Sequence, residues 1–247
     1  MTQQHASPSN KKSPRNIVNV SPDPASDWSM YAYEVSKFVY SESVMSCSVE
    51  KPDPSKFLSG NSVSICKLTV NDKFSYHAKL LRAPDAESVY LQTVRERYPA
   101  IVEDSSVLIP TVVDFIDSCG VLQNYLHLTR WVPHIGTLAE IVILLWSRQR
   151  HSELEKLLRD FGKFLKAFHT RYPRLHHNDM NPSNVLIIDL PANRVPPTFA
   201  LVDCAGLDDE VGDDFASFLL SMDVLDEGGF GPEFKALASE AFTSGYS

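Results

Sequence analysis

The pattern of hydrophobic and polar positions divides the chain into a strand-rich first part and a helical second part. Apolar and polar side chains alternate over several segments of six to eight residues, which is typical of half-buried β-strands. The first two of these segments are separated by Asn71-Asp72-Lys73, which predicts a hairpin turn. The strands are predicted at residues 63–70, 74–81, 111–116 and 121–128.

Helical spacing of apolar residues appears in two places. After Pro84-Asp85, one helix face carries Glu87, Leu91 and Val94, and Pro99 marks the end of that helix within a residue or two. The chain turns helical again from Thr137. A small antiparallel sheet with one helix, followed by a helical lobe, predicts an α+β fold with two lobes. The long helix ending near His169 carries a buried stripe predicted at Leu154, Leu157, Leu158, Phe161, Leu165 and Phe168.

Residues 1–27 differ from the rest, because they are rich in Ser, Pro, Asn and Gln and have almost no apolar side chains before Ile17. Such a segment cannot offset its ordering entropy by burial, so we predict a disordered tail. Its Ser-Pro pairs are potential phosphorylation sites, although a solvated tail without a role in the fold is the favoured interpretation. The predicted organisation is this tail, an N-lobe at residues 28–128 and a helical C-lobe at residues 129–247.

Charge and cysteine content exclude some functions. The net charge of −8 and the absence of a long Lys/Arg run argue against nucleic-acid binding. The four cysteines are scattered without a C-x-x-C pair, so the sequence suggests neither a zinc site nor a disulfide framework. The N-terminus lacks an apolar core of the signal-peptide type.

The longest apolar run, Ile141–Trp146, is far shorter than the roughly 20 residues that a transmembrane helix requires. It is expected to belong to a buried helix, with an exposed partner surface as the alternative. We therefore expect a soluble, reduced, cytoplasmic protein without membrane insertion.

Residues suited to phosphoryl transfer are found in the segment His177–Ile187 and in the strand that follows. Asp179 is followed five residues later by Asn184, which leads into an apolar strand, and Asp203 closes the next apolar strand. Phosphoryl transfer from a nucleotide needs a carboxylate to orient the attacking hydroxyl and accept its proton. It also needs oxygen ligands for Mg²⁺. Asp179 suits the first task as catalytic residue, and Asn184 with Asp203 suits the second as metal ligands.

This order of H-x-D-x-x-x-x-N, strand, turn and strand ending in Asp resembles the catalytic core of the protein-kinase-like phosphotransferases. The resemblance spans about residues 56–218 and implies a bilobal protein-kinase-like fold with a shortened helical C-lobe. It is closer to the aminoglycoside phosphotransferase and choline kinase branch. Asn178 replaces an Arg and Asn181 a Lys of Ser/Thr kinases, and the turn at Asp203-Cys204-Ala205-Gly206 lacks the Phe of D-F-G.

The resemblance also implies a nucleotide site in the first part of the chain. Lys79 ends Tyr76-His77-Ala78-Lys79, which is similar to the V-A-I-K strand of kinases, and would hold the phosphates while tethered by Glu87. Glu96 is the alternative tether, and a solvated edge charge is the alternative role of Lys79. The remaining nucleotide contacts implied are Gly60, Asn61 and Ser62 in a phosphate-covering hairpin, and Leu126 and Leu128 along the adenine edge.

Two of the motif residues have plausible structural roles. His177 resembles a core histidine of this family, packed beneath the Asp203 turn and without chemistry of its own. Asp179 has the alternative of a turn residue, because Asn-Asp and Asn-Pro pairs often form turns. The joint pattern with Pro182, Asn184 and two apolar strands favours the catalytic interpretation. Similarly, the single-glycine segment at residues 58–65 could be an ordinary hairpin.

The implied activity is that of an ATP- and Mg²⁺-dependent phosphotransferase acting on an alcohol group, with a small-molecule hydroxyl as the favoured acceptor. A pseudokinase-type nucleotide-binding or interaction module and an atypical protein kinase are the alternatives. Only 44 residues follow Asp203, fewer than family members usually have for their acceptor pocket. The expectation is therefore either a trimmed acceptor site or one that a partner chain or another part of the gene product completes.

Overall fold

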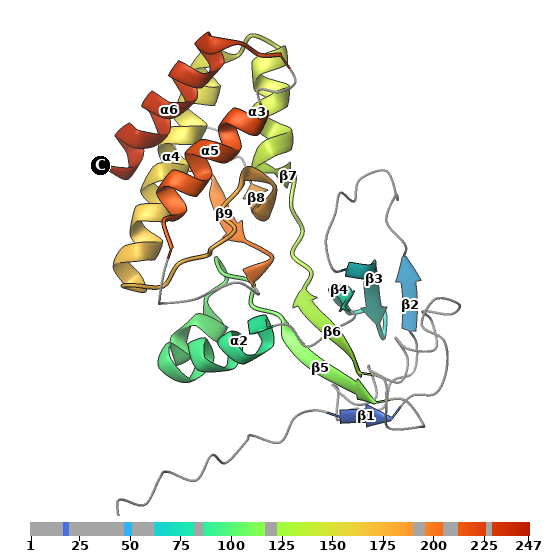
Figure 1. The fold of residues 1–247 in the computed structure, drawn as a ribbon. Coiled ribbons are helices and arrows are strands. Elements are labelled where there is room, and N and C mark those ends of the chain that lie inside the picture. Colours follow the sequence, from blue (N-terminus) through green and yellow to red (C-terminus); the bar gives the residue numbers. More distant parts are fainter. Residues whose placement is uncertain are drawn as a thin grey trace, which may run out of the picture. The chain divides into compact units, whose positions relative to one another are not determined.

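The computed structural model describes residues 17–19, 47–50, 62–81, 86–116, 123–189, 196–204, 212–225 and 229–247. These residues form small, mainly antiparallel sheets and α-helices (Figure 1), which confirms the predicted α+β fold class. The chain has two compact units. The first comprises Met1–Ala83 with Thr111–Leu128, and the second comprises Pro84–Pro110 with Thr129–Ser247.

The first unit contains a six-stranded sheet in the order β1-β5-β6-β4-β3-β2. The four strands predicted from alternation are all present, as β3, β4, β5 and β6. In the turn between β3 and β4, Asn71 and Asp72 have φ values of 52° and 50°, a left-handed conformation that Asn and Asp adopt more readily than most residues. The strands are β1 (Ile17–Asn19), β2 (Cys47–Glu50), β3 (Ser62–Val70), β4 (Phe74–Leu81), β5 (Thr111–Ile116) and β6 (Gln123–Arg130).

Strand β1 lies within the segment for which composition predicted disorder. Ile17, Val18 and Asn19 pair in parallel with Asp114, Phe115 and Ile116 of β5. Ile17 and Val18 are β-branched residues, which favour strands, and they are the first apolar residues after a long polar stretch. A composition averaged over 27 residues does not reveal a strand of 3 residues.

The second unit combines a three-stranded sheet, in the order β7-β8-β9, with the helices. The two helices predicted from apolar spacing are confirmed as α2 and α4, and α2 ends just before Tyr98 and Pro99. The strands are β7 (Gly136–Thr137), β8 (Val185–Asp189) and β9 (Thr198–Leu201). The helices are α2 (Ala86–Arg97), α3 (Leu138–Ser147), α4 (His151–Arg171), α5 (Asp214–Leu225) and α6 (Pro232–Tyr246), with 3-10 turns η2 (Pro99–Glu103) and η3 (Pro182–Asn184).

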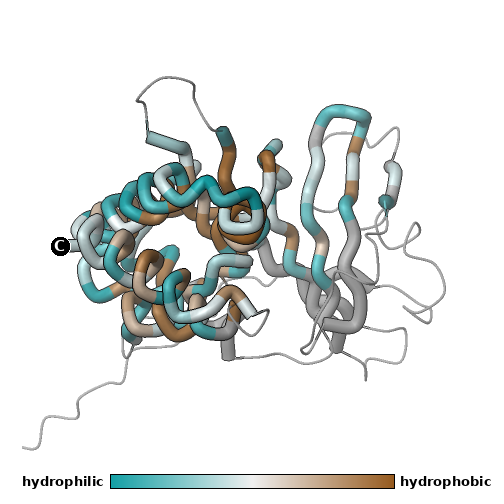
Figure 2. Tube along the Cα trace, turned by 90° about the horizontal axis from the view of Figure 1, so that it is seen from above, coloured by the Kyte–Doolittle hydropathy of each residue, from teal (hydrophilic) through white to brown (hydrophobic). Residues whose placement is uncertain are grey.

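The core of the second unit is built on α4. Phe161 on this helix is fully buried and contacts aromatic rings from three other elements, at centroid distances of 5.4 Å to Phe199, 4.8 Å to Phe218 and 5.8 Å to Phe242. The helices carry hydrophobic and hydrophilic positions along their length, brown and teal in Figure 2. The predicted stripe is buried throughout, at Leu154, Leu157, Leu158, Phe161, Leu165 and Phe168.

Helix α3 contains the apolar run of residues 141–146. Thr137 and Glu140 form a capping box, in which each side chain accepts a hydrogen bond from the other residue's backbone N–H, and this fixes the start of the helix. Val142 is fully buried, whereas Leu144 remains 39% exposed. The run therefore belongs to a helix with one buried face. Among the described helices, none is both long and apolar enough to cross a bilayer.

Helices α4 and α6 cross closely because each has a glycine at the contact. A Cβ atom at Gly245 would lie 2.0 Å from the carbonyl oxygen of Arg159, and one at Gly162 would lie 2.4 Å from that of Phe242. Both obstacles are backbone atoms, which cannot rotate away. The crossing therefore requires glycine at both positions.

Gly245→Ala is expected to destabilise the protein by about 2 kcal/mol, because overpacking against the α4 backbone forces the two helices apart. Alanine in an ordinary helical position would instead stabilise by up to about 1 kcal/mol through its higher helix propensity. The sign of the change in the free energy of unfolding, measured with urea, distinguishes the two effects. Ser244→Ala, at an exposed position of the same helix, is the matched control with an expected change within about 0.5 kcal/mol. An unchanged or raised stability for Gly245→Ala would contradict the close crossing.

Candidate active site

The loop between α4 and β8 places two amide side chains against the carboxylate of Asp179. Asn184 donates from Nδ2 to Oδ2 of Asp179 at 2.8 Å and to its main-chain oxygen at 2.9 Å. Asn181 donates from Nδ2 to Oδ1 of the same carboxylate at 3.1 Å. Each carboxylate oxygen of Asp179 thus has an amide donor, and the exposed side chain is held in one orientation.

The local sequence explains why this loop adopts its shape. Asn178 has a φ of 63°, in the left-handed region that asparagine tolerates better than most residues. Asn181 accepts a hydrogen bond from the N–H of Ser183 at 3.0 Å and caps the 3-10 turn η3, which begins with Pro182. Proline suits a first helical position, because its fixed φ is helical and an N–H there has no partner within the turn. The turn ends at Asn184, directly before β8.

Val202 connects this loop with the Asp203 turn. Its N–H donates to the carbonyl oxygen of Asn184 at 2.9 Å, and its own carbonyl oxygen accepts from Nε2 of His177 at 2.8 Å. His177 is fully buried, which agrees with the structural role expected for it beneath the Asp203 turn. Asp203 is the next residue, is exposed and has a φ of 56°. Asp179 therefore contacts Asn184, and Asn184 is bonded to the residue that precedes Asp203.

Asp214, the first residue of α5, holds the same loop from beneath. Asp214 is 1% exposed, and its carboxylate accepts hydrogen bonds from the N–H of His177 at 2.8 and 3.0 Å and from the N–H of Asn178 at 3.1 Å. It also accepts a hydrogen bond from Nε2 of His169 at 2.9 Å. Burial alone raises the pKa of Asp214, but these hydrogen bonds outweigh it and hold the pKa below its ordinary value.

Asp214 is not among the site residues predicted from the sequence. The adjacent Asp213 already provides the helix cap, since its Oδ1 accepts from the N–H of Ala216 at 2.9 Å. A second acidic residue, placed where the apolar segment begins, is the signal that could have revealed a buried carboxylate with another task.

The residues predicted for the nucleotide site lie in both units. Lys79 is half-buried in β4, opposite Ile65 of β3, and Leu128 is buried in β6. For Leu126 in β6, Ser62 in β3 and Glu87 in α2, the backbone element is described but the side chain is not. Gly60 and Asn61 lie outside the described residues. Glu96, the alternative partner of Lys79, is exposed on α2. These assignments stay predictions.

Comparison with known proteins gives only distant similarity. No family model and no curated protein sequence matches the chain. Among solved structures, the BubR1 kinase domain is similar with a TM-score of 0.45 and 14% identity over 62% of this chain and 46% of that chain, so this chain spans less than half of its length. WaaP, in complex with acyl carrier protein, is similar with a TM-score of 0.47 and 16% identity over 81% of this chain and 89% of that chain. At these scores neither likeness bears on function.

Proposed function

We propose that this chain is a protein-kinase-like phosphotransferase that uses ATP and Mg²⁺ to phosphorylate a hydroxyl group, in the first place that of a small molecule. One observation carries the proposal. Asp179 is hydrogen-bonded to Asn184, and Asn184 is bonded through its backbone to Val202, beside Asp203. This arrangement links a carboxylate suited to accept a proton with two oxygen-bearing side chains suited to hold a cation.

Asp179 is assigned the role of orienting the acceptor hydroxyl and accepting its proton. Its carboxylate is exposed, so an acceptor can approach it, and the amides of Asn181 and Asn184 restrict its rotation. Catalysis of phosphoryl transfer depends mainly on positioning and charge stabilisation. A carboxylate held in place before the acceptor binds loses less entropy when the reaction begins.

Asn184 and Asp203 are assigned to the metal ion, and their chemistry fits Mg²⁺. Because Asn184 uses its Nδ2 for Asp179, its carbonyl oxygen is at the opposite end of the amide and can face a cation. Asp203 adds a carboxylate from the neighbouring turn, and oxygen ligands of these two kinds are those that Mg²⁺ prefers. When bound, ATP supplies the phosphoryl group and the cation offsets the charge of the phosphates.

The nucleotide contacts follow from the same proposal. Lys79, tethered by Glu87, would engage the α- and β-phosphates, and the backbone at Gly60, Asn61 and Ser62 would cover them. The strand containing Leu126 and Leu128 would hold the adenine edge. These roles rest on the resemblance of the sequence to kinases, and the half-buried position of Lys79 in β4 is compatible with them.

The test is transfer of labelled phosphate from ATP to a pooled panel of hydroxyl-containing metabolites and proteins, with Asp179→Asn as the comparison. We expect transfer by the wild-type chain and a rate at least about 100-fold lower in the variant, because a positioned general base contributes about 10²–10⁴ in rate. Asp223→Asn, which removes an exposed carboxylate on α5, is the matched control and should retain the wild-type rate. Undiminished transfer by Asp179→Asn would refute the assignment. Binding of ATP with Mg²⁺ but no transfer to any acceptor would instead favour a nucleotide-binding module.

A further inference from the structure

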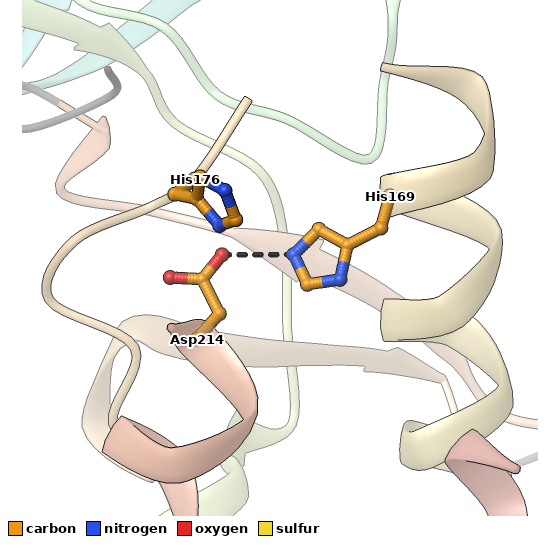
Figure 3. Close-up of side chains that lie close together, drawn as sticks. All are labelled: His169, His176 and Asp214. Carbon is orange, nitrogen blue, oxygen red and sulfur yellow. Dashed lines mark hydrogen bonds and ion pairs between the residues drawn. The ribbon is translucent and has the colours of Figure 1, made fainter. Parts of the chain in front are cut away.

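A second group of potential metal ligands lies beneath the catalytic loop, in three separate segments of the chain. His169 is in the last turn of α4, His176 precedes the loop, and Asp214 begins α5. Their potential ligand atoms all lie within 4.8 Å of one another. Figure 3 shows the two imidazole rings and the carboxylate facing a common point. None of the three belongs to the set Asp179, Asn184 and Asp203.

His176 has a buried ring nitrogen that lacks a partner. Its Nδ1 is inaccessible to solvent and makes no hydrogen bond within the described structure. A buried polar atom without a hydrogen bond costs about 1–3 kcal/mol of stability, so binding of a ligand to this nitrogen would be favourable. The backbone of Gly212 lies close beside this side chain, since a Cβ atom at Gly212 would lie 2.5 Å from Cβ and 2.7 Å from Cγ of His176.

The other two side chains are oriented by neighbours that a metal ion would leave in place. Nδ1 of His169 lies 2.7 Å from the hydroxyl of Tyr246, and a metal-bound histidine commonly has such a partner on its second nitrogen. Asp214 is held by the backbone N–H groups of His177 and Asn178. What would change is the hydrogen bond between Nε2 of His169 and Oδ2 of Asp214, now 2.9 Å long. In the metal complex both atoms would bind the ion, while Nδ1 would keep a proton and donate it to the Tyr246 oxygen.

We propose that His169, His176 and Asp214 bind one divalent transition-metal ion, with zinc as the expected species. Two imidazole nitrogens and one carboxylate oxygen are ligands that zinc accepts at about 2.0–2.2 Å, with a fourth position left for water. Mg²⁺ prefers oxygen ligands, so this site and the proposed Mg²⁺ site select different ions. The ion would tie the end of α4 and the start of α5 to the segment that leads into the catalytic loop.

The test is zinc titration of the tag-free full chain after treatment with EDTA, without nucleotide or Mg²⁺. His176→Phe keeps a ring of similar size and removes both nitrogens. His151→Phe is the matched control, because it makes the same exchange at an exposed histidine that stacks on Trp146 at a ring distance of 4.4 Å. We expect one equivalent of zinc to bind the wild-type chain and His151→Phe, with at least about 100-fold weaker binding in His176→Phe.

Thermal unfolding provides a second measurement. An ion that binds only the folded state raises the melting temperature, so zinc should stabilise the wild-type chain and leave His176→Phe unchanged. Circular dichroism without zinc checks that the variant folds, and His176→Gln replaces it if the variant does not. Equal zinc affinity in wild type and variant, or no saturable binding in the wild type, would overturn the proposal. Because ATP and Mg²⁺ are absent, this result and the phosphotransfer result are independent.

Discussion

Asp203→Asn is expected to lower phosphoryl transfer by at least about 1,000-fold while leaving the protein folded. The substitution removes the one negative charge that the two proposed metal ligands contribute, since the other ligand, Asn184, is neutral. Metal-assisted charge stabilisation is worth several kcal/mol in such reactions, and a 1,000-fold loss corresponds to about 4 kcal/mol. The measurement is the initial rate of transfer at saturating ATP over a range of Mg²⁺ concentrations.

Asparagine is a better replacement than alanine at this position, because it disturbs the backbone less. Asp203 has a φ of 56°, which asparagine adopts readily but which costs alanine about 1–2 kcal/mol. Because Asp203 is also exposed, the free energy of unfolding should stay within about 0.5 kcal/mol of the wild-type value. A loss of transfer can then be attributed to the site.

Asp223→Asn again is the matched control and should leave transfer unchanged. For Asp203→Asn, the rate that remains should rise with excess Mg²⁺, because a weakened site is filled by mass action. A wild-type rate with a wild-type dependence on Mg²⁺ would show that Asp203 does not hold the metal ion.

Much of the fold follows from local patterns that sequence reasoning can detect. Strands β3 to β6 were predicted from alternation, and α2 and α4 from helical spacing, because both patterns can be recognised within a short stretch of sequence. The burial of His177 and its hydrogen bond to Val202 also agree with the structural role predicted for this residue. The strand and helix predictions depend on residues close together in sequence.

The contacts that were not predicted join residues far apart in sequence. Asp214 reaches the backbone of His177 and Asn178 across a separation of 36–37 residues, and no periodicity indicates such a pairing. The grouping of His169 and His176 with Asp214 depends on the same tertiary contact. The cysteine pattern argued against zinc, but it does not address sites built from histidine and carboxylate.

The close crossing of α4 and α6 was not predicted for the same reason, because it joins residues far apart in sequence. In the sequence, Gly162 and Gly245 are only residues that weaken a helix. The packed structure shows that each faces the backbone of the other helix. Strand β1 was missed for a different reason, because its few residues were averaged with a long polar segment.

Asp214→Ala is expected to lower the free energy of unfolding by about 4 kcal/mol, a large part of the stability of an ordinary domain. Asp214 is 1% exposed, and its carboxylate accepts hydrogen bonds from two backbone N–H groups and from His169. Alanine would leave these donors buried without acceptors, and each such group costs about 1–3 kcal/mol. Urea unfolding in the presence of EDTA measures the loss without any contribution from bound metal.

Asp213→Ala, one residue earlier, is the matched control. Asp213 is exposed and caps α5 through the N–H of Ala216, so its loss should cost only about 1 kcal/mol. Equal destabilisation by the two variants would mean that Asp214 is no more than another helix cap. If the carboxylate of Asp214 instead holds the loop, amide hydrogen exchange at His177 and Asn178 should accelerate in Asp214→Ala and not in Asp213→Ala. The backbone next to Asp179, the proposed catalytic residue, should then also become more mobile, because Asn178 joins the anchored N–H groups to it.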